Sequence, residues 1–434
     1  MARNKELGQK STPTAKTSGG KFKFCKAPFA SIYVRPRVKI DPNDPPKTDV
    51  SFCCVQTEHY ILNDGQTIND FWKSDWAQNH RQQFLNNEWP SSCSECQWRE
   101  NNNVDSDIDS HRHIPIETFD IEAGNELQKP RYIDYRPDNL CNLMCTMCSP
   151  ANSNLIEDMW RELPLNTQWH RLANKPLEGE ERPYNETLIT KELIGENTLR
   201  LKVLGGEPTI NKKVHSVFQY AIDNGYAKHI DLKITTNFTN MNKTYKMFDE
   251  FNSCKINASL DASGPTYDYI RRPAKWKSVK KNLLQFGERY QGTYPKMGWG
   301  MNLVWQLANC FTTKEWLPEI LELFYVNENL KNLRWEGDRI SMINCDGSGI
   351  TLEAVPESMK HYIIDDLNDV LKDWKHIPGA KNNIETLIKY TKRAEFSKNH
   401  HVAFKRKFTL MDQYKKTDMF ELSPKFKELY DYKA

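Results

Sequence analysis

The chain has 434 residues, of which 38% are hydrophobic and 27% are charged. Its 60 Lys and Arg residues nearly balance 57 Asp and Glu residues, so the formal net charge is only +3. This balance argues against a surface built for nucleic acid. No stretch approaches the roughly 18 consecutive apolar residues of a membrane span, so we expect no membrane partner.

The first 21 residues contain no apolar segment of the kind that directs secretion, which predicts a disordered tail at 1–21 and a cytoplasmic protein. An organelle transit peptide is the alternative, because this segment is rich in Ser and Thr and has a single acid, Glu6. Disulfides are rare in reducing compartments. The eleven cysteines of the chain therefore point to metal binding or catalysis.

Hydrophobic patterning divides the remainder into three parts. Residues 22–110 begin with an alternating strand and a turn, followed by a short helix over 71–85. Residues 341–434 look helical and polar. Between them, over 131–340, helices alternate with six predicted strands: 131–137, 198–206, 229–237, 255–263, 298–309 and 330–340. Alternating units predict parallel strands, and six are too few for a closed eight-stranded barrel. We therefore expect an α/β fold, a partial (β/α)6 barrel.

Three cysteines form a tight group directly after the first barrel strand. Cys141, Cys145 and Cys148 occur in LCNLMCTMCSP with the spacing C-x3-C-x2-C. Three thiolates on one loop could hold an iron–sulfur cluster and leave one iron open to a ligand, as a catalytic site requires. A zinc loop and three unrelated thiols are the alternatives for this pattern taken by itself.

A second motif ends the next strand, where GGEP comprises Gly205, Gly206, Glu207 and Pro208. Glycines allow a backbone to approach a ligand closely, and a carboxylate can accept hydrogen bonds from an ammonium group. Alone, GGEP could be a simple strand-to-helix turn. Its position one strand after the cysteine loop places both motifs at the same end of the predicted barrel.

In order and separation, these two motifs resemble those of the radical S-adenosylmethionine superfamily, over about residues 131–340. The resemblance implies a [4Fe–4S] cluster on Cys141, Cys145 and Cys148, whose open iron binds the amino and carboxylate groups of S-adenosylmethionine. It implies that GGEP holds the amino end of the methionine. It also implies an enzyme that reductively cleaves S-adenosylmethionine to a 5′-deoxyadenosyl radical, which abstracts hydrogen from a substrate.

Later strand ends match the same family more loosely. The resemblance implies cofactor contacts from Asn237 after the third strand and from Ser259, which would reach the ribose. It assigns the methionine carboxylate to Arg271, with Arg272 as the competitor, because a guanidinium matches a carboxylate with two parallel hydrogen bonds. The fifth strand offers two candidates for the adenine contact, Asn302 and Val304.

Five cysteines lie in the first hundred residues: Cys25, Cys53, Cys54, Cys93 and Cys96. They could form a zinc ribbon. Their order, with Arg81 and Glu100, resembles the twitch and SPASM modules that hold an auxiliary iron–sulfur cluster, here placed before the barrel. That resemblance implies a [4Fe–4S] cluster on Cys25, Cys93, Cys96 and either Cys54 or Cys53, with Cys54 preferred. Zinc stays the alternative, because it also accepts four thiolates.

The remaining cysteines have simpler interpretations. Cys254 is expected in the core, because free cysteine packs as a small hydrophobe. Cys310 and Cys345 follow the fifth and sixth strands and could return a hydrogen atom to a substrate radical, although structural thiols are the simpler interpretation. Glu336 and Asp338 are candidate proton acceptors or merely solvated charges.

The resemblance to twitch and SPASM proteins implies a peptide or protein substrate and an electron donor such as flavodoxin or ferredoxin. Two alternatives stay open. One is a radical enzyme that acts on a small molecule or an RNA base. The other is a non-catalytic protein stabilised by zinc at both cysteine sites, which the GGEP segment argues against.

Overall fold

The computed structural model describes residues 25–36, 48–63, 65–101, 129–162, 193–335, 340–345 and 349–433. The predicted tail at 1–21 lies outside these residues, as do Glu336 and Asp338.

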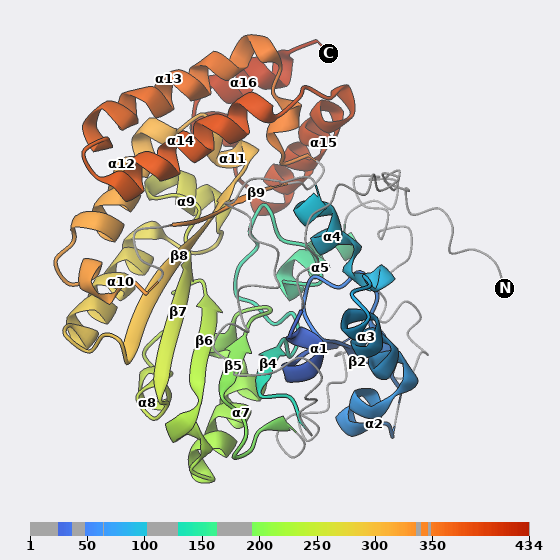
Figure 1. Ribbon diagram of the computed structural model, residues 1–434. Helices are drawn as coiled ribbons and strands as arrows, with labels where there is room; N and C mark the ends of the chain where they lie inside the picture. The colour runs from blue at the N-terminus through green and yellow to red at the C-terminus, as the bar shows by residue number, and fades with distance from the viewer. Residues whose placement is uncertain are drawn as a thin grey trace.

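A single nine-stranded sheet runs through the molecule in the order β3-β2-β1-β4-β5-β6-β7-β8-β9 (Figure 1). Strands β4 to β9 are all parallel to their neighbours, and helices connect them. These six strands confirm the predicted partial (β/α)6 barrel. The strands are β1 Ser31–Pro36, β2 Thr48–Ser51, β3 Tyr60–Leu62, β4 Tyr132–Tyr135, β5 Arg200–Val203, β6 Asp231–Thr236, β7 Ser253–Ser259, β8 Met297–Trp305 and β9 Ser341–Asn344.

Helices cover the outer face of this sheet and build the C-terminal part of the chain. Those of the N-terminal segment and the barrel are α1 Ala27–Ala30, α2 Ile68–Lys73, α3 Asp75–Leu85, α4 Ser94–Asn101, α5 Asn154–Glu162, α7 Lys212–Asp223, α8 Tyr245–Phe248, α9 Gly264–Ile270, α10 Trp276–Tyr290, α11 Leu307–Cys310 and α12 Thr313–Leu321. The C-terminal helices are α13 Glu357–Trp374, α14 Pro378–Arg393, α15 Lys398–Lys415 and α16 Pro424–Asp431.

Buried and partly exposed side chains alternate along the barrel strands, because one face of each strand packs on helices and the other lines the interior. In β6, Leu232 and Ile234 are fully buried against the helical layer, whereas Lys233 is partly exposed on the opposite face. The strand register places Lys202, Lys233 and Lys255 side by side on β5, β6 and β7. The barrel interior is therefore polar, as an interior that receives a polar ligand should be.

The N-terminal strands continue the barrel sheet. Strand β1 pairs parallel with β4 and antiparallel with β2, so residues predicted as a separate N-terminal module share backbone hydrogen bonds with the barrel. The helix predicted over 71–85 is two helices, α2 and α3. They separate at Ser74, whose extended backbone and side chain cap α3 by accepting a hydrogen bond from the Ala77 amide. The predicted domain boundaries, 22–110, 131–340 and 341–434, stay a prediction.

The sixth strand lies later than predicted. Residues 331–333 form a 3-10 turn, and Arg334 makes only an isolated bridge to Trp299. The indole of Trp335 then enters the barrel interior, where Gly298 and Gly300 leave room for it and Lys233 Nζ lies 4.0 Å from its ring centre. The strand itself, β9, begins only at Ser341. The prediction of a strand was therefore wrong for the described residues 331–335, where the chain turns and the Trp335 side chain packs against Gly298 and Gly300.

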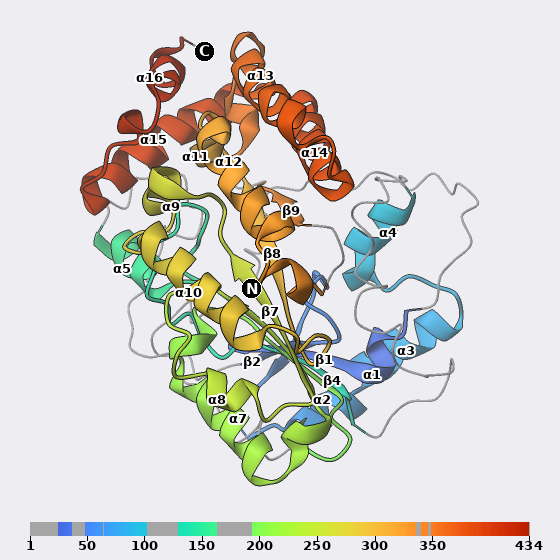
Figure 2. The same ribbon diagram turned by 90° about the vertical axis from the view of Figure 1, so that its left-hand side faces the viewer.

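The C-terminal extension is helical, as predicted. Figures 1 and 2 show α13 to α16 gathered at one end of the molecule, next to α11 and α12. Their apolar residues, including Ile363, Leu387 and Phe404, are buried in the same core as the barrel helices. Among the described residues, no helix is long and apolar enough to cross a membrane.

Candidate active site

The three cysteines of the C-x3-C-x2-C motif lie on the loop between β4 and α5, at the carboxyl ends of the barrel strands. Cys141 and Cys145 are buried, Cys148 is partly exposed, and none forms a disulfide. Parallel barrels place their chemistry at this end, because the loops from all strands converge there. The fold therefore presents the cysteine loop where the sequence predicted it.

Backbone hydrogen bonds hold this loop against its neighbours on two sides. On the α5 side, the Cys141 amide donates to Asn154 Oδ1 over 2.7 Å. On the α9 side, the Met144 amide donates to the Arg272 carbonyl over 2.6 Å, and the Thr146 amide donates to the Ile270 carbonyl over 3.0 Å. These contacts anchor the cysteine loop both to α5 and to the end of α9.

The three thiols interact with one another. Cys145 and Cys148 share a side-chain hydrogen bond, which lowers the pKa of Cys145 to about 7. Burial, together with the smaller effect of the neighbouring Cys145, raises the pKa of Cys141 to about 12. Among the described residues, no group of three or more His, Cys, Asp or Glu side chains is placed to hold a single metal ion. A cubane cluster differs from a single ion, because each thiolate binds its own iron atom.

Arg271 faces this loop. Its Nη1 donates to Cys145 Sγ over 3.8 Å, and its Nη2 lies 2.6 Å from Asp261 Oδ2. Both partners of this ion pair are buried, and burial raises the pKa of Asp261. The other carboxylate oxygen of Asp261 accepts a hydrogen bond from the Val304 amide. Sequence reasoning placed Arg271 near the cluster but missed the role of Asp261 in holding it there.

The two glycines of GGEP allow a close contact between two loops. Both have left-handed backbones, with φ of +90° at Gly205 and +51° at Gly206. A Cβ on Gly206 would meet the Leu140 carbonyl, and one on Gly205 would lie 3.1 Å from the Asp138 carbonyl oxygen. The Glu207 amide donates to the Leu140 oxygen over 2.7 Å. The GGEP segment therefore packs on the residues that lead into Cys141.

The Glu207 carboxylate is buried and accepts four hydrogen bonds from protein donors. Three reach Oε1, from the Thr209 amide, the Thr209 hydroxyl and the Thr236 hydroxyl. The fourth reaches Oε2 from the Asn237 amide over 2.7 Å. Burial nevertheless raises its pKa. Glu207 thus links the ends of β5 and β6, and Pro208 follows it as the buried first residue of the 3-10 turn η3, Pro208–Ile210.

Asn237 belongs to the same rim, and Ser259 ends the neighbouring strand β7. Asn237 Nδ2 donates to Asn142 Oδ1 over 3.0 Å, which connects the end of β6 to the cysteine loop. Ser259 pairs with Asn302 across β7 and β8, on the face that lines the barrel interior. Direct contacts therefore connect the cysteine loop to GGEP, Asn237 and Arg271, whereas the described contacts of Ser259 do not reach this group, so its predicted role stays a prediction.

Unpaired donors remain beside the cysteine loop. Gln306 Oε1 accepts a hydrogen bond from the Thr146 hydroxyl, whereas its Nε2 is buried without a partner among the described residues. Arg271 Nε is also buried without a hydrogen-bond partner among the described residues. Buried donors need acceptors. Thiolates, sulfides and carboxylates are acceptors, so these two groups fit an anionic cofactor.

Two lysines that sequence reasoning missed also approach this loop from the C-terminal extension. Lys407 and Lys415 of α15 are buried, and burial lowers the pKa of each to about 8. Both interact electrostatically with Cys148, and Lys415 also does so with Cys145. No sequence signal in the polar C-terminal segment distinguishes these lysines from its solvated ones.

The N-terminal cysteines approach one another around Cys53. Cys53 interacts electrostatically with Cys25 and Cys93, and burial raises its pKa. Cys54 instead interacts with Tyr33, Arg136 and Lys202 at the barrel interior. These neighbours favour Cys53 rather than Cys54 as the companion of Cys25 and Cys93. Cys96 is buried one helical turn beyond Cys93.

A network of buried polar side chains supports this cysteine group. The Ser92 hydroxyl lies 3.9 Å from Cys93 Sγ and pairs with both Gln56 and His80. Arg81 Nε donates to the Pro28 carbonyl, and its guanidinium lies 4.4 Å from the Trp72 ring centre. The predicted motif residue Arg81 therefore joins α3 to the segment that carries Cys25.

The isolated cysteines are structural in two cases. Cys254 is fully buried in the core, as predicted. Cys310 is also fully buried, and its thiol donates to the Leu307 carbonyl, so it does not open onto the barrel mouth. Cys345 is partly buried beyond β9 and interacts electrostatically with Lys407.

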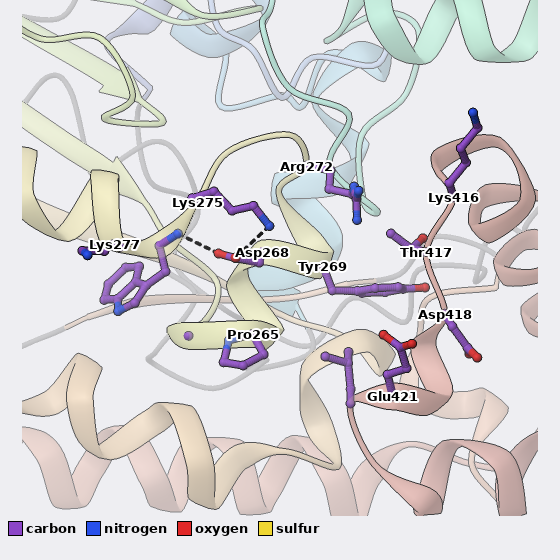
Figure 3. Close-up of a pocket in the computed structure, with 13 residues that line it drawn as sticks. Pro265, Asp268, Tyr269, Arg272, Lys275, Lys277, Lys416, Thr417, Asp418 and Glu421 are labelled. Carbon is purple, nitrogen blue, oxygen red and sulfur yellow. Dashed lines mark hydrogen bonds and ion pairs between the residues drawn. The ribbon is translucent and has the colours of Figure 1, made fainter.

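A pocket of about 980 Å³ lies on the outside of the barrel, between α9 and the turn that follows α15 (Figure 3). Arg272 and Tyr269 line it from one side, and Lys416, Thr417 and Asp418 line it from the other. None of the predicted cysteine ligands is among its lining residues. The pocket is therefore distinct from the cysteine loop. Arg272 lines this pocket, whereas Arg271 contacts Cys145 in the loop.

No family model and no curated protein matches the chain. Among solved structures, the chain is similar to Streptococcus suis SuiB bound to precursor peptide SuiA, with 14% identity and a TM-score of 0.33 over 79% of this chain and 68% of that one. It is also similar to anSMEcpe with bound AdoMet and Cp18Cys peptide, with 14% identity and a TM-score of 0.33 over 56% of this chain and 60% of that one.

The candidate site is best described by where its sequence motifs lie in the fold. Six parallel strands, the three-cysteine loop after the first strand and the GGEP segment after the second occur together at one end of a partial barrel. This is the placement that the resemblance to the radical S-adenosylmethionine superfamily implied for the two motifs.

Proposed function

We propose that this protein is a radical S-adenosylmethionine enzyme that abstracts hydrogen from a peptide or protein substrate. One observation carries the proposal: GGEP, which follows β5, and Arg271, which ends α9, both contact the cysteine loop. Gly206 packs on Leu140, and Arg271 Nη1 donates to Cys145 Sγ over 3.8 Å. A structural zinc site needs neither contact.

Cys141, Cys145 and Cys148 would hold a [4Fe–4S] cluster, and the rim around them would hold S-adenosylmethionine. When bound, these groups supply reductive cleavage of S-adenosylmethionine and removal of a hydrogen atom from the substrate. The protein's part is to fix the reacting groups and exclude water. The backbone hydrogen bonds of the cysteine loop provide that rigidity.

Arg271 and Glu207 have distinct roles in this proposal. Two of the Arg271 nitrogens serve Asp261 and Cys145, which leaves Nε as the buried donor for a methionine carboxylate. Glu207 is occupied by its four protein donors and positions the GGEP backbone. Asn237, which is hydrogen-bonded to the cysteine loop, would contact the amino end, and Ser259 at the end of β7 would contact the ribose.

The N-terminal cysteines would hold an auxiliary [4Fe–4S] cluster. We assign it to Cys25, Cys53, Cys93 and Cys96, with Cys53 in place of Cys54, because Cys53 is the member of the pair that interacts with Cys25 and Cys93. The resemblance of this cysteine pattern to twitch and SPASM modules is the reason that we propose a peptide or protein substrate and not a small molecule or an RNA base. An electron donor such as flavodoxin or ferredoxin and a cytoplasmic location complete the proposal.

The test compares Cys145→Ala with Cys254→Ala. The Cys254→Ala substitution also removes one buried thiol, but it does so in the barrel core and leaves the cysteine loop intact. With anaerobically reconstituted and reduced protein, wild type and Cys254→Ala should form 5′-deoxyadenosine, whereas Cys145→Ala should form none. Mass measurement of candidate peptides then identifies the product. Cleavage by Cys145→Ala at the wild-type rate would overturn the proposal, and a colourless zinc-loaded wild type would favour the binding-protein alternative.

A further inference from the structure

One face of α15 lies against the cysteine loop. Lys407, Met411 and Lys415 recur every four residues, so they share one side of the helix, and all three are buried. Met411 packs with Ile156 and Met159 of α5, and Cys148 of the loop lies against the same cluster. Figures 1 and 2 both show α15 beside α5. The C-terminal extension therefore covers the cysteine loop.

The Lys415 ammonium has no hydrogen-bond partner among the residues that the structure describes, and its side chain is 93% buried. The neighbouring acid, Asp412, is already engaged. It accepts hydrogen bonds from the Tyr269 hydroxyl, the Thr417 hydroxyl and the Met419 amide. Tyr269 and Thr417 face each other in Figure 3. The charge of Lys415 is therefore not balanced by a direct hydrogen bond to a carboxylate.

The groups around Lys415 indicate which anion would balance its positive charge. Its electrostatic neighbours are Lys407, Asp412 and the thiols Cys145 and Cys148. Lys407 in turn neighbours Cys148 and Cys345. A buried cation such as Lys415 is unfavourable unless an anion lies beside it. Cys145 and Cys148, the thiols of the cysteine loop that interact with this face, are predicted cluster ligands.

We infer that Lys407 and Lys415 form an electrostatic counterpart to the iron–sulfur cluster at Cys141, Cys145 and Cys148, and that they make this cluster easier to reduce. This inference rests on the proposed function, because it requires that cluster. A cubane held by thiolates carries negative charge, and an added electron makes it more negative. Nearby positive charge stabilises the reduced state more than the oxidised state, and local charge sets cluster potentials.

The carboxylate of S-adenosylmethionine has the same anionic chemistry and would occupy the same end of the barrel. The two anions are distinguished by what each lysine changes. A lysine that serves the cluster alters its reduction potential in the absence of S-adenosylmethionine. A lysine that serves the carboxylate alters the affinity for S-adenosylmethionine and leaves that potential unchanged.

The test uses Lys415→Met, which keeps an apolar chain of similar length, and Lys415→Arg, which restores the charge. Lys398→Met is the control, because Lys398 is the exposed first residue of the same helix, about 25 Å away at 1.5 Å rise per residue. Each full-length protein is reconstituted anaerobically, and the cluster is titrated by electron paramagnetic resonance. The cluster of interest is identified as the signal that changes when S-adenosylmethionine is added.

We expect Lys415→Met to lower the equilibrium constant for reduction at least tenfold, which is about 59 mV for a one-electron couple. Lys415→Arg and Lys398→Met should match wild type, and calorimetry should show unchanged S-adenosylmethionine affinity in the oxidised state. An unchanged potential in Lys415→Met would overturn the inference, whether or not the affinity falls. Loss of cluster iron in Lys415→Met that Lys415→Arg restores would support it. A wild type without a cluster signal would instead refute the proposed function.

Discussion

Gly206 brings the GGEP segment of the proposed cofactor site into close contact with the cysteine loop. Its φ of +51° lies in the left-handed region. A Cβ built there would overlap the Leu140 carbonyl oxygen and lie 2.7 Å from its carbonyl carbon and 2.8 Å from its nitrogen. These are backbone atoms that cannot rotate away. Because Leu140 directly precedes Cys141, Gly206→Ala should displace the cysteine loop.

The magnitude follows from two contributions. A left-handed backbone costs an alanine about 1–2 kcal/mol. Forced displacement of packed atoms typically adds about 1–3 kcal/mol. Gly206→Ala should therefore destabilise the protein by about 2–5 kcal/mol. Gly225→Ala is the matched control, because Gly225 has a φ of +75° with nothing within 4 Å of its built Cβ. It should cost only the first contribution.

The assay combines denaturant unfolding with calorimetry of S-adenosylmethionine binding to the reconstituted protein. We expect Gly206→Ala to weaken binding at least tenfold, about 1.4 kcal/mol, and Gly225→Ala to leave it unchanged. Equal stability losses in the two variants, with equal affinities, would show that the two loops do not depend on their close contact at Gly206.

Two further predictions concern the ion pair and the cysteine pair. Asp261→Asn should lower the free energy of unfolding by about 3–5 kcal/mol, because it leaves Arg271 buried without its counterion. Asp249→Asn, in the exposed pair with Arg289 at the same 2.6 Å separation, should lower it by about 0–1 kcal/mol. Equal losses in denaturant unfolding would contradict the role of burial. Cys53→Ala should lose about half of the protein-bound iron and Cys54→Ala should lose none, taking a four-thiolate site as one cluster, and the reverse pattern would return the ligand assignment to Cys54.

Short-range patterns determined much of this fold. Strand β8 could be recognised from its run of apolar residues, and its bounds at Met297–Trp305 fall close to the predicted segment. The same reasoning found the helices of the C-terminal extension. Such patterns are readable because each element repeats with its own period and buries one face. The segment around Trp335 misled this reasoning, because its apolar side chain fills the barrel interior from a turn.

The cysteine spacing and GGEP determined the identity of the candidate site for a similar reason. A cluster loop needs its thiols close together in sequence, and a close approach between loops needs glycine. Both requirements leave a local signature. The parallel order of the strands then brings the two motifs to the same end of the barrel, and this follows from the alternation of helices and strands.

Only the tertiary structure decided which groups face one another across that site. The adjacent ends of β7 and β8 hold Asp261 through the Val304 amide, and α9 then brings Arg271 back onto Asp261. Glu207 binds donors that follow it by two and about thirty residues. The choice between Cys53 and Cys54 depends on which neighbour each thiol faces, and adjacent residues of an irregular segment carry no period that reveals it. Lys415 lies 270 positions after Cys145 in the sequence. Its burial against the cysteine loop results from the docking of a whole helix, which depends on the summed packing of many side chains and leaves no mark at the lysine itself.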